Sequence, residues 1–443
     1  MKHHGHDQLK INQNAKRLEG MKGGFFGGPI AATTTGLIKA SGMGLAVFLA
    51  SWGGAAADPF LDAITGGHVS LQLRPRYQFM QQAGKEDANA FTLRTLLGFS
   101  SKPLYGISAD LQFINVAGIV NDYNSLRNGK TAYALIPDPE ETNINQAFLA
   151  YTGLPGTVLR AGRQIINLDD QRFVGDVDFR QTQQTFDAVT LANRSLPAVQ
   201  LYAAYAWRIK DIVNELIPAR VFLAEATWTP APILHANVFG YWYGNQANSV
   251  IPGAVTCFLP GGPQACNSGT VGVRLAGSMP LPADFHLLYD ASYAKQLPYD
   301  GGNSLVNAQY THLGGGATWR DLGLHADYML MGANSSGTYG FQTPLATRHA
   351  FNGWAEVFLL TPPKGLQSLY VTATAKVWQT ALQATYYDFH ADTGNLHYGN
   401  ELDLSAIHTF TKHWSGGVQY ADYRATGYGV NTQGAWVFVT AHY

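Results

Sequence analysis

The charged residues that could do chemistry together are concentrated between Leu159 and Leu191. Two strand-like pieces there flank about twenty polar residues, and loops of that length are usually either functional or disordered. Neighbouring carboxylates suit acid–base catalysis, whereas carboxylates beside arginine suit bidentate hydrogen bonds. We favour ion pairs over catalysis, because the charges are interleaved with apolar residues such as Phe173 and Phe179. The ion pairs would hold an ordered segment that folds back onto the space enclosed by the flanking strands. The charged members of this constriction segment are Asp169, Asp170, Arg172, Asp176 and Arg180.

Other arginines recur on the polar faces of alternating segments. A guanidinium group binds carboxylates through paired hydrogen bonds, and rings of arginine or lysine select anions in pores. The alternative is that a neighbouring aspartate or glutamate neutralises each arginine, which then only holds the wall together. We expect a solute-conducting surface formed by Arg74, Arg76, Arg94, Arg160, Arg163 and Arg274.

An enzyme is the weaker interpretation. The chain has no G-x-S-x-G elbow, and His235, His286, His312 and His325 are scattered over separate predicted strands. The spacing of Asp170, Asp176 and Asp178 matches no calcium loop. We therefore expect no catalytic residues, no metal ion and no cofactor. Besides a solute-conducting protein and an enzyme, the third alternative is a purely structural protein, a barrel whose pore is plugged.

The elements that position these residues have a membrane-like but finely mixed composition. Only 13% of the 443 residues are charged, about half the usual share, and yet mean hydropathy is close to zero. Apolar and polar residues must therefore alternate, as they do in transmembrane β-barrels. In Thr270–Met279, for example, Val271, Val273 and Leu275 share one face and Arg274 lies on the other.

The two ends of the chain indicate secretion. Residues 1–57 combine basic residues, the short apolar run Met43–Trp52 and Ala55-Ala56-Ala57, the pattern of a secretory leader. A short N-terminal periplasmic segment, residues 58–67, would follow. Beyond the leader no apolar run is long enough for a spanning helix, so a closed barrel remains as the membrane structure. The chain ends on an alternating strand and the aromatic Tyr443, which predicts the outer membrane of a Gram-negative bacterium.

Short turns alternate with longer loops from residue 68 to residue 443. Outer-membrane barrels have short periplasmic turns, long outer loops and an even number of strands. One strand between each pair of successive connections gives an antiparallel, all-β barrel of 18 strands, with 16 as the alternative. The longest connections, Ile165–Gln184 and Gly332–Leu366, are expected to fold into the lumen. Another long outer loop holds Cys257 and Cys266, and we predict a disulfide between them because that compartment permits one.

Several motifs resemble the outer-membrane alginate export porin family. They are Gly162-Arg163-Gln164, Asp169-Asp170-Gln171-Arg172-Phe173-Val174-Gly175, Phe179-Arg180-Gln181, Phe341-Gln342-Thr343-Pro344-Leu345-Ala346-Thr347 and Asn352-Gly353-Trp354-Ala355. The resemblance implies an 18-stranded barrel with an arginine-lined lumen that passes an anionic polysaccharide such as alginate. A general or specific porin for small organic anions is the alternative. Expected partners are outer-membrane lipid and lipopolysaccharide, the anionic solute and periplasmic export components, but not nucleic acid.

Overall fold

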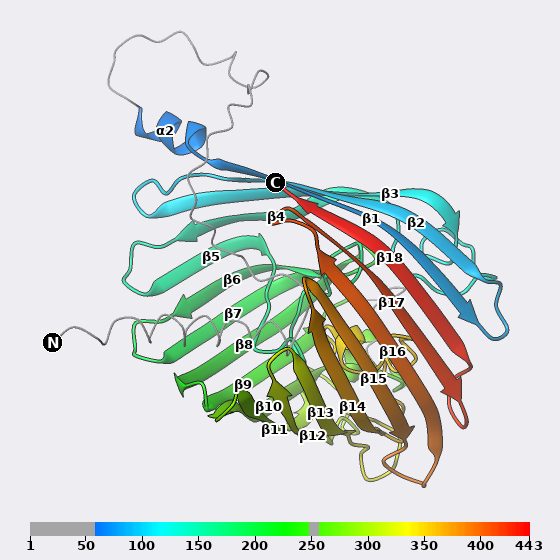
Figure 1. The fold of residues 1–443 in the computed structure, drawn as a ribbon. Coiled ribbons are helices and arrows are strands. Elements are labelled where there is room, and N and C mark those ends of the chain that lie inside the picture. The colour runs from blue at the N-terminus through cyan, green and yellow to red at the C-terminus, as the bar shows by residue number, and fades with distance from the viewer. Residues whose placement is uncertain (1–57, 248–256) are drawn as a thin grey trace.

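A computed structural model describes residues 58–247 and 257–443 and shows one closed antiparallel barrel (Figure 1). The leader predicted for residues 1–57 lies outside the described residues. Closure follows from the pairing of β1 with both β2 and β18, which confirms the 18-stranded prediction. The strands are β1 (His68–Gln82), β2 (Ala88–Ser100), β3 (Ile107–Asp122), β4 (Glu141–Tyr151), β5 (Thr157–Gln164), β6 (Thr185–Asn193), β7 (Val199–Lys210), β8 (Leu216–Ala231), β9 (Leu234–Asn245), β10 (Ser268–Leu281), β11 (Phe285–Pro298), β12 (Ala308–Trp319), β13 (Leu322–Met331), β14 (Leu366–Val377), β15 (Thr380–His390), β16 (His397–Thr409), β17 (Trp414–Ala425) and β18 (Thr432–His442).

The strands form because their side chains suit two different surroundings. On β10, Val271, Val273 and Leu275 are each nearly half exposed on the outer wall, while Thr270 and Ala276 are buried on the inner wall. Lipid in place of water makes the exposed apolar face favourable. The ladder satisfies the backbone polar groups of each strand, a requirement in a bilayer.

A short helix precedes the barrel where the sequence predicted only a periplasmic segment. Helix α2 (Pro59–Thr65) begins after Asp58, whose side chain accepts a hydrogen bond from the Phe60 backbone N–H. That contact satisfies one of the free N–H groups of the first turn. No helix in the ranges 58–247 and 257–443 is long and apolar enough to cross a membrane.

Two long connections fold inward and pack against each other. Residues 165–184, here called the first inward segment, join β5 to β6, and residues 332–365, the second inward segment, join β13 to β14 and include η2 (Arg348–Ala350). A parallel β-bridge links Val174 to Leu345. Phe173 packs against Phe239 and Tyr310 of the wall, with ring centroids 4.8 and 5.3 Å apart. Both segments therefore belong to the packed interior.

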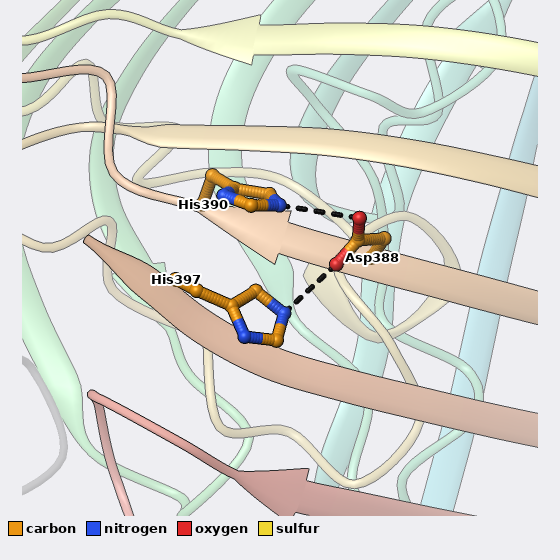
Figure 2. Close-up of side chains that lie close together, drawn as sticks. All are labelled: Asp388, His390 and His397. Atoms are coloured by element: carbon orange, nitrogen blue, oxygen red, sulfur yellow. Dashed lines mark hydrogen bonds and ion pairs between the residues drawn. The ribbon is translucent and has the colours of Figure 1, made fainter. Parts of the chain in front are cut away.

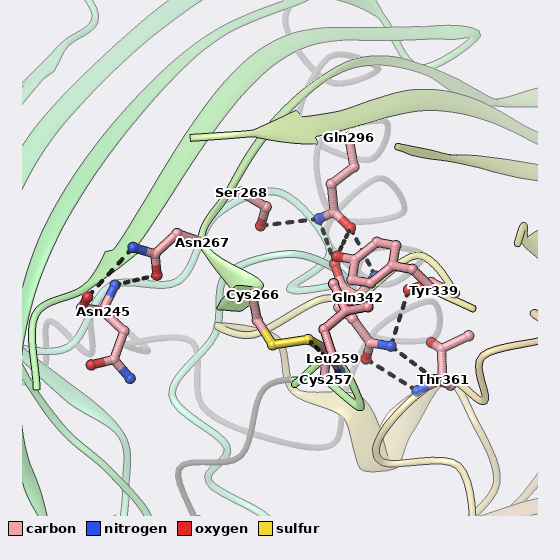
Figure 3. The surroundings of a disulfide bond; sticks show 11 residues. Asn245, Cys257, Leu259, Cys266, Asn267, Ser268, Gln296, Tyr339, Gln342 and Thr361 are labelled. Carbon is pink, nitrogen blue, oxygen red and sulfur yellow. Dashed lines mark hydrogen bonds between the residues drawn. A yellow bond between two sulfur atoms is a disulfide. The ribbon is translucent and has the colours of Figure 1, made fainter. Parts of the chain in front are cut away.

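A disulfide fixes the loop between β9 and β10. Cys257 and Cys266 are bonded in the structure, with Cα atoms 5.8 Å apart, and Cys266 ends the 3₁₀ helix η1 (Pro263–Cys266) (Figure 3). Next to it, Asn267 accepts the Asn245 backbone N–H at 2.7 Å and donates to the Asp300 carbonyl at 2.9 Å. The base of this loop is thus bound to the end of β9 and to the connection between β11 and β12.

Candidate functional site

The first inward segment is attached to β1 and β2 by an ion cluster. The Asp178 carboxylate lies 2.6 Å from Nη1 of Arg94 and 3.8 Å from Nη1 of Arg74. Arg74 also donates to the Asp178 carbonyl at 2.8 Å and to Oε1 of Gln181 at 3.0 Å. Both guanidinium groups are almost fully buried beneath the segment. These wall arginines therefore bind a carboxylate of the protein itself.

Arg76, the second basic residue of β1, joins this cluster to the loop between β3 and β4. Its guanidinium pairs with the Asp138 carboxylate and donates to the Phe179 carbonyl. Asp138 also accepts the Gln181 backbone N–H at 2.7 Å and lies 3.6 Å from Arg180. Asp138 was not singled out from the sequence, because it lies in a loop distant from its partners along the chain.

The opposite end of the segment is attached to the other side of the barrel. Asp169 accepts a hydrogen bond from Nη1 of Arg274 on β10 at 2.8 Å, and Asp170 lies 3.6 Å from the same guanidinium. Asp290 on β11 binds Arg274 at 2.5 Å. Strands β1 and β10 are nine positions apart in either direction around the ring (Figure 1). The segment consequently spans the barrel interior.

These contacts correct the expected role of Arg172. The sequence suggested that its guanidinium pairs with the adjacent carboxylates, but only its backbone N–H contacts Asp170, at 3.0 Å. The guanidinium donates to Oδ1 of Asn352 at 3.0 Å and lies over the rings of Tyr310 and Phe351, 5.2 and 5.1 Å from their centroids. Cation–π contacts of this kind stabilise a desolvated guanidinium. Arg172 therefore joins the two inward segments.

Arg180 also bridges the two inward segments. Its guanidinium pairs with Glu356, and the neighbouring Trp354 and Ala355 backbone N–H groups donate to Asp403 at 3.1 Å and Glu401 at 2.6 Å on β16. The second inward segment is thereby held by the wall on one side and by the first segment on the other.

Two nearby carboxyl groups of the first inward segment, Asp176 and Asp178, have pKa values shifted in opposite directions. Burial opposes ionisation of Asp178, but Arg94 and Arg74 outweigh it and hold its pKa below the usual value. Burial and the adjacent Asp178 raise the pKa of Asp176 to about 7. At neutral pH, Asp178 therefore supplies the charge that attaches the segment, while Asp176 is close to half protonated.

Arg160 and Arg163, both expected to face the conducting surface, lie on opposite faces of β5. Arg163 stands opposite Asp187, on the outward face that also carries the exposed Val189, and pairs with Asp187 at 2.7 Å. The prediction for Arg163 was wrong because residues three apart on a strand point to opposite faces. Arg160 is on the inner face, exposed, with its guanidinium over Phe148. Within the described part of the chain it forms no ion pair.

A cavity of about 110 Å³ lies where the two inward segments meet β7 and β9. Arg348 lines it and donates to the carbonyls of Thr343 and Leu359, at 3.0 and 2.9 Å. Among residues 58–247 and 257–443 it has no carboxylate partner. Burial lowers the pKa of Arg348 to about 10, so it stays charged at neutral pH. The sequence alone did not point to Arg348, although this residue directly follows the Phe341–Thr347 motif.

Comparison with solved structures shows the same fold in three proteins of Pseudomonas aeruginosa. OpdK, solved with vanillate, matches with a TM-score of 0.65 at 13% identity, covering 86% of this chain and 99% of that one. OpdL and OpdQ match with TM-scores of 0.62 and 0.63 at 15% and 14% identity, and with the same coverage. A comparison with curated protein sequences finds no match.

A family model described as alginate export matches residues 68–353, which is more than half of the chain and includes the whole first inward segment. The family model thus covers the segment whose ion pairs with β2 and β10 connect opposite sides of the 18-stranded barrel. The chain belongs to the alginate export family of porins in the Gram-negative outer membrane.

Proposed function

We propose that the barrel allows passive passage of an anionic polysaccharide such as alginate, and that its inner arginines bind the carboxylates of the polymer. The observation that carries this proposal is the binding of Asp178 by Arg74 and Arg94. A paired guanidinium site that already holds one carboxylate has the chemistry to hold a uronate. The non-enzymatic character of the porin family agrees with a transport role.

Passage requires the first inward segment to leave the wall. A polyuronate presents many carboxylates in succession, so its effective concentration at the site is high once one unit has entered. Its carboxylates would replace Asp178 on Arg74 and Arg94. Arg160 is exposed on the inner face of β5, three residues after the first residue of that strand and close to the short periplasmic turn. A polymer that enters from the periplasm would therefore contact Arg160 before it reaches Arg74 and Arg94.

A porin for small organic anions is the second candidate. It is favoured by the cavity of about 110 Å³ between the inward segments, which suits a small acid better than a polymer chain. OpdK, which shares the fold, was solved with vanillate, a small acid. The two candidates differ in the size of the solute and in whether the first inward segment has to move.

Planar-bilayer recording separates the candidates. We expect anion selectivity in a salt gradient, a weaker selectivity in Arg160→Gln, and block by polyuronate at lower carboxylate concentration than by monomeric uronate. Arg320→Gln is the matched control, because that side chain is 67% exposed at the turn between β12 and β13. Cation selectivity that Arg160→Gln leaves unchanged would contradict the anion mechanism. Block by small acids but not by polyuronate would favour the small-solute porin, and a silent barrel would favour a structural role.

A further inference from the structure

Three potential metal ligands lie together at one end of β15 and β16, away from the inward segments' ion pairs. Nε2 of His390 is 3.1 Å from Oδ2 of Asp388, and Nε2 of His397 is 2.9 Å from Oδ1 of the same carboxylate (Figure 2). One ligand atom from each residue lies within 4.8 Å of the other two. The three side chains are each between 33% and 43% exposed, so a solvated ion can reach them.

The strand register brings these residues together. His390 stands directly opposite His397, and Asp388 is two residues before His390 on the same face. This face is the outer wall, because Tyr386 and Leu402 on it are exposed while Phe389 and Glu401 on the other face are fully buried. The six-residue connection 391–396 is on the same side as the long loops, which places the group at the outer rim of the barrel.

We propose that Asp388, His390 and His397 form a binding site for a divalent transition metal ion of the Zn²⁺ class. Imidazole nitrogen suits zinc, copper and nickel, whereas magnesium and calcium prefer oxygen ligands alone. Two histidines and one carboxylate are a common zinc ligand set, with the fourth position left to water. At zinc bond lengths of about 2.1 Å, ligand atoms lie roughly 3.4 Å apart, so small side-chain rotations are sufficient.

The surroundings already orient the carboxylate. Nδ2 of Asn400 donates to Oδ1 of Asp388 at 3.0 Å, and hydrogen bonds of this kind hold metal-ligating carboxylates in place. Both imidazoles direct Nε2 at the Asp388 carboxylate, His390 at Oδ2 and His397 at Oδ1 (Figure 2), so the two nitrogens lie on the side of the carboxylate where an ion could bind all three residues. An ion there replaces two hydrogen bonds with three coordinate bonds.

Metal binding would steady the loop that holds the second inward segment. In the connection between β15 and β16, Asp392 accepts the Ala333 backbone N–H at 2.8 Å, and the Thr393 backbone N–H donates to the Lys364 carbonyl at 3.1 Å. Ala333 and Lys364 lie at the two ends of that segment. A metal ion bound at Asp388, His390 and His397 would thus stabilise the base of the connection 391–396, to which both ends of the second inward segment are hydrogen-bonded.

Zinc titration of the untagged barrel in detergent, by calorimetry with Zn²⁺ alone, tests the proposal. We expect one Zn²⁺ per chain at a site that excess Mg²⁺ does not displace, and at least a tenfold weaker affinity in His390→Gln and in His397→Gln. His408→Gln is the matched control, because His408 lies near the other end of β16 and bonds to Thr380. It should bind as the wild type does.

Absorption of the Co²⁺-substituted protein gives an independent measurement, since a four-coordinate cobalt site shows intense visible bands that His397→Gln should remove. Folding of each variant is checked by the gel shift between heated and unheated barrel. Absence of zinc binding, equal affinity in the wild type and both ligand variants, or displacement by Mg²⁺ would each overturn the proposal.

Discussion

Neutralising Asp178 should weaken the attachment of the first inward segment to β1 and β2. In Asp178→Asn, the ion pairs to Arg94 at 2.6 Å and to Arg74 at 3.8 Å are lost. Arg74 keeps its contacts with two backbone carbonyls and with Gln181, and Arg94 keeps its contact with Gln72. Neither guanidinium is left without hydrogen bonds, so the variant should fold.

The magnitude follows from the kind of contact removed. A hydrogen bond to a charged group contributes about 1.5–3 kcal/mol, and the amide that replaces the carboxylate offers only part of this. Because 1.4 kcal/mol corresponds to a factor of ten, the equilibrium between the attached and the released segment should shift by about 10- to 100-fold. In single-channel recordings at pH 7, the open probability should increase accordingly.

Asp176→Asn is the matched control for this experiment. Asp176 lies two residues away in the same segment, is already close to half protonated at pH 7 and has no arginine in an ion pair within the described residues. We expect no increase of its open probability. If Asp178→Asn and Asp176→Asn gated alike, or if Asp178→Asn left gating unchanged, the attachment of the segment through Asp178 would be refuted.

Three further outcomes are expected. The pKa of Asp176 is raised to about 7 in the attached segment, so attachment retains a proton that is lost as the pH rises. Attachment is therefore strongest at low pH and weakens towards pH 7, by less than tenfold per pH unit. Open probability recorded from pH 5 to 8 should rise, and a flat profile would contradict this. Cys257 and Cys266 should react with an alkylating reagent only after reduction, so labelling of untreated protein would exclude the disulfide. Val273→Arg, on the lipid face of β10, should destabilise the barrel by about 2–4 kcal/mol, measured by urea titration in lipid vesicles; an unchanged midpoint would place that face away from lipid.

The fold was predictable because it depends on local alternation. Period-two segments such as Thr270–Met279 have one lipid-compatible face, and a barrel must pair every strand. Alternating turn lengths then determine the strand number. Helix α2 was missed because seven residues carry too little periodicity, although Asp58-Pro59 is a typical helix start.

The site was only partly predictable, because its partners are distant in the sequence. The charged segment was identified, but the pairing of Asp169 with Arg274 and of Asp178 with Arg94 depends on which strands face each other across the ring. Likewise, Asp388 and His397 become neighbours only through the register of β15 and β16. The misplaced Arg163, in contrast, was decidable from strand parity relative to Arg160.

Passage of a polyuronate through the barrel is the central claim, and voltage-dependent blockade of single channels tests it most directly. With polyuronate on the periplasmic side of Asp178→Asn channels, we predict transient blockades whose duration shortens as the driving voltage rises and lengthens with chain length, because the polymer leaves on the opposite side. Blockades that lengthen with voltage would show that the polymer enters but does not pass, and would contradict export through this barrel.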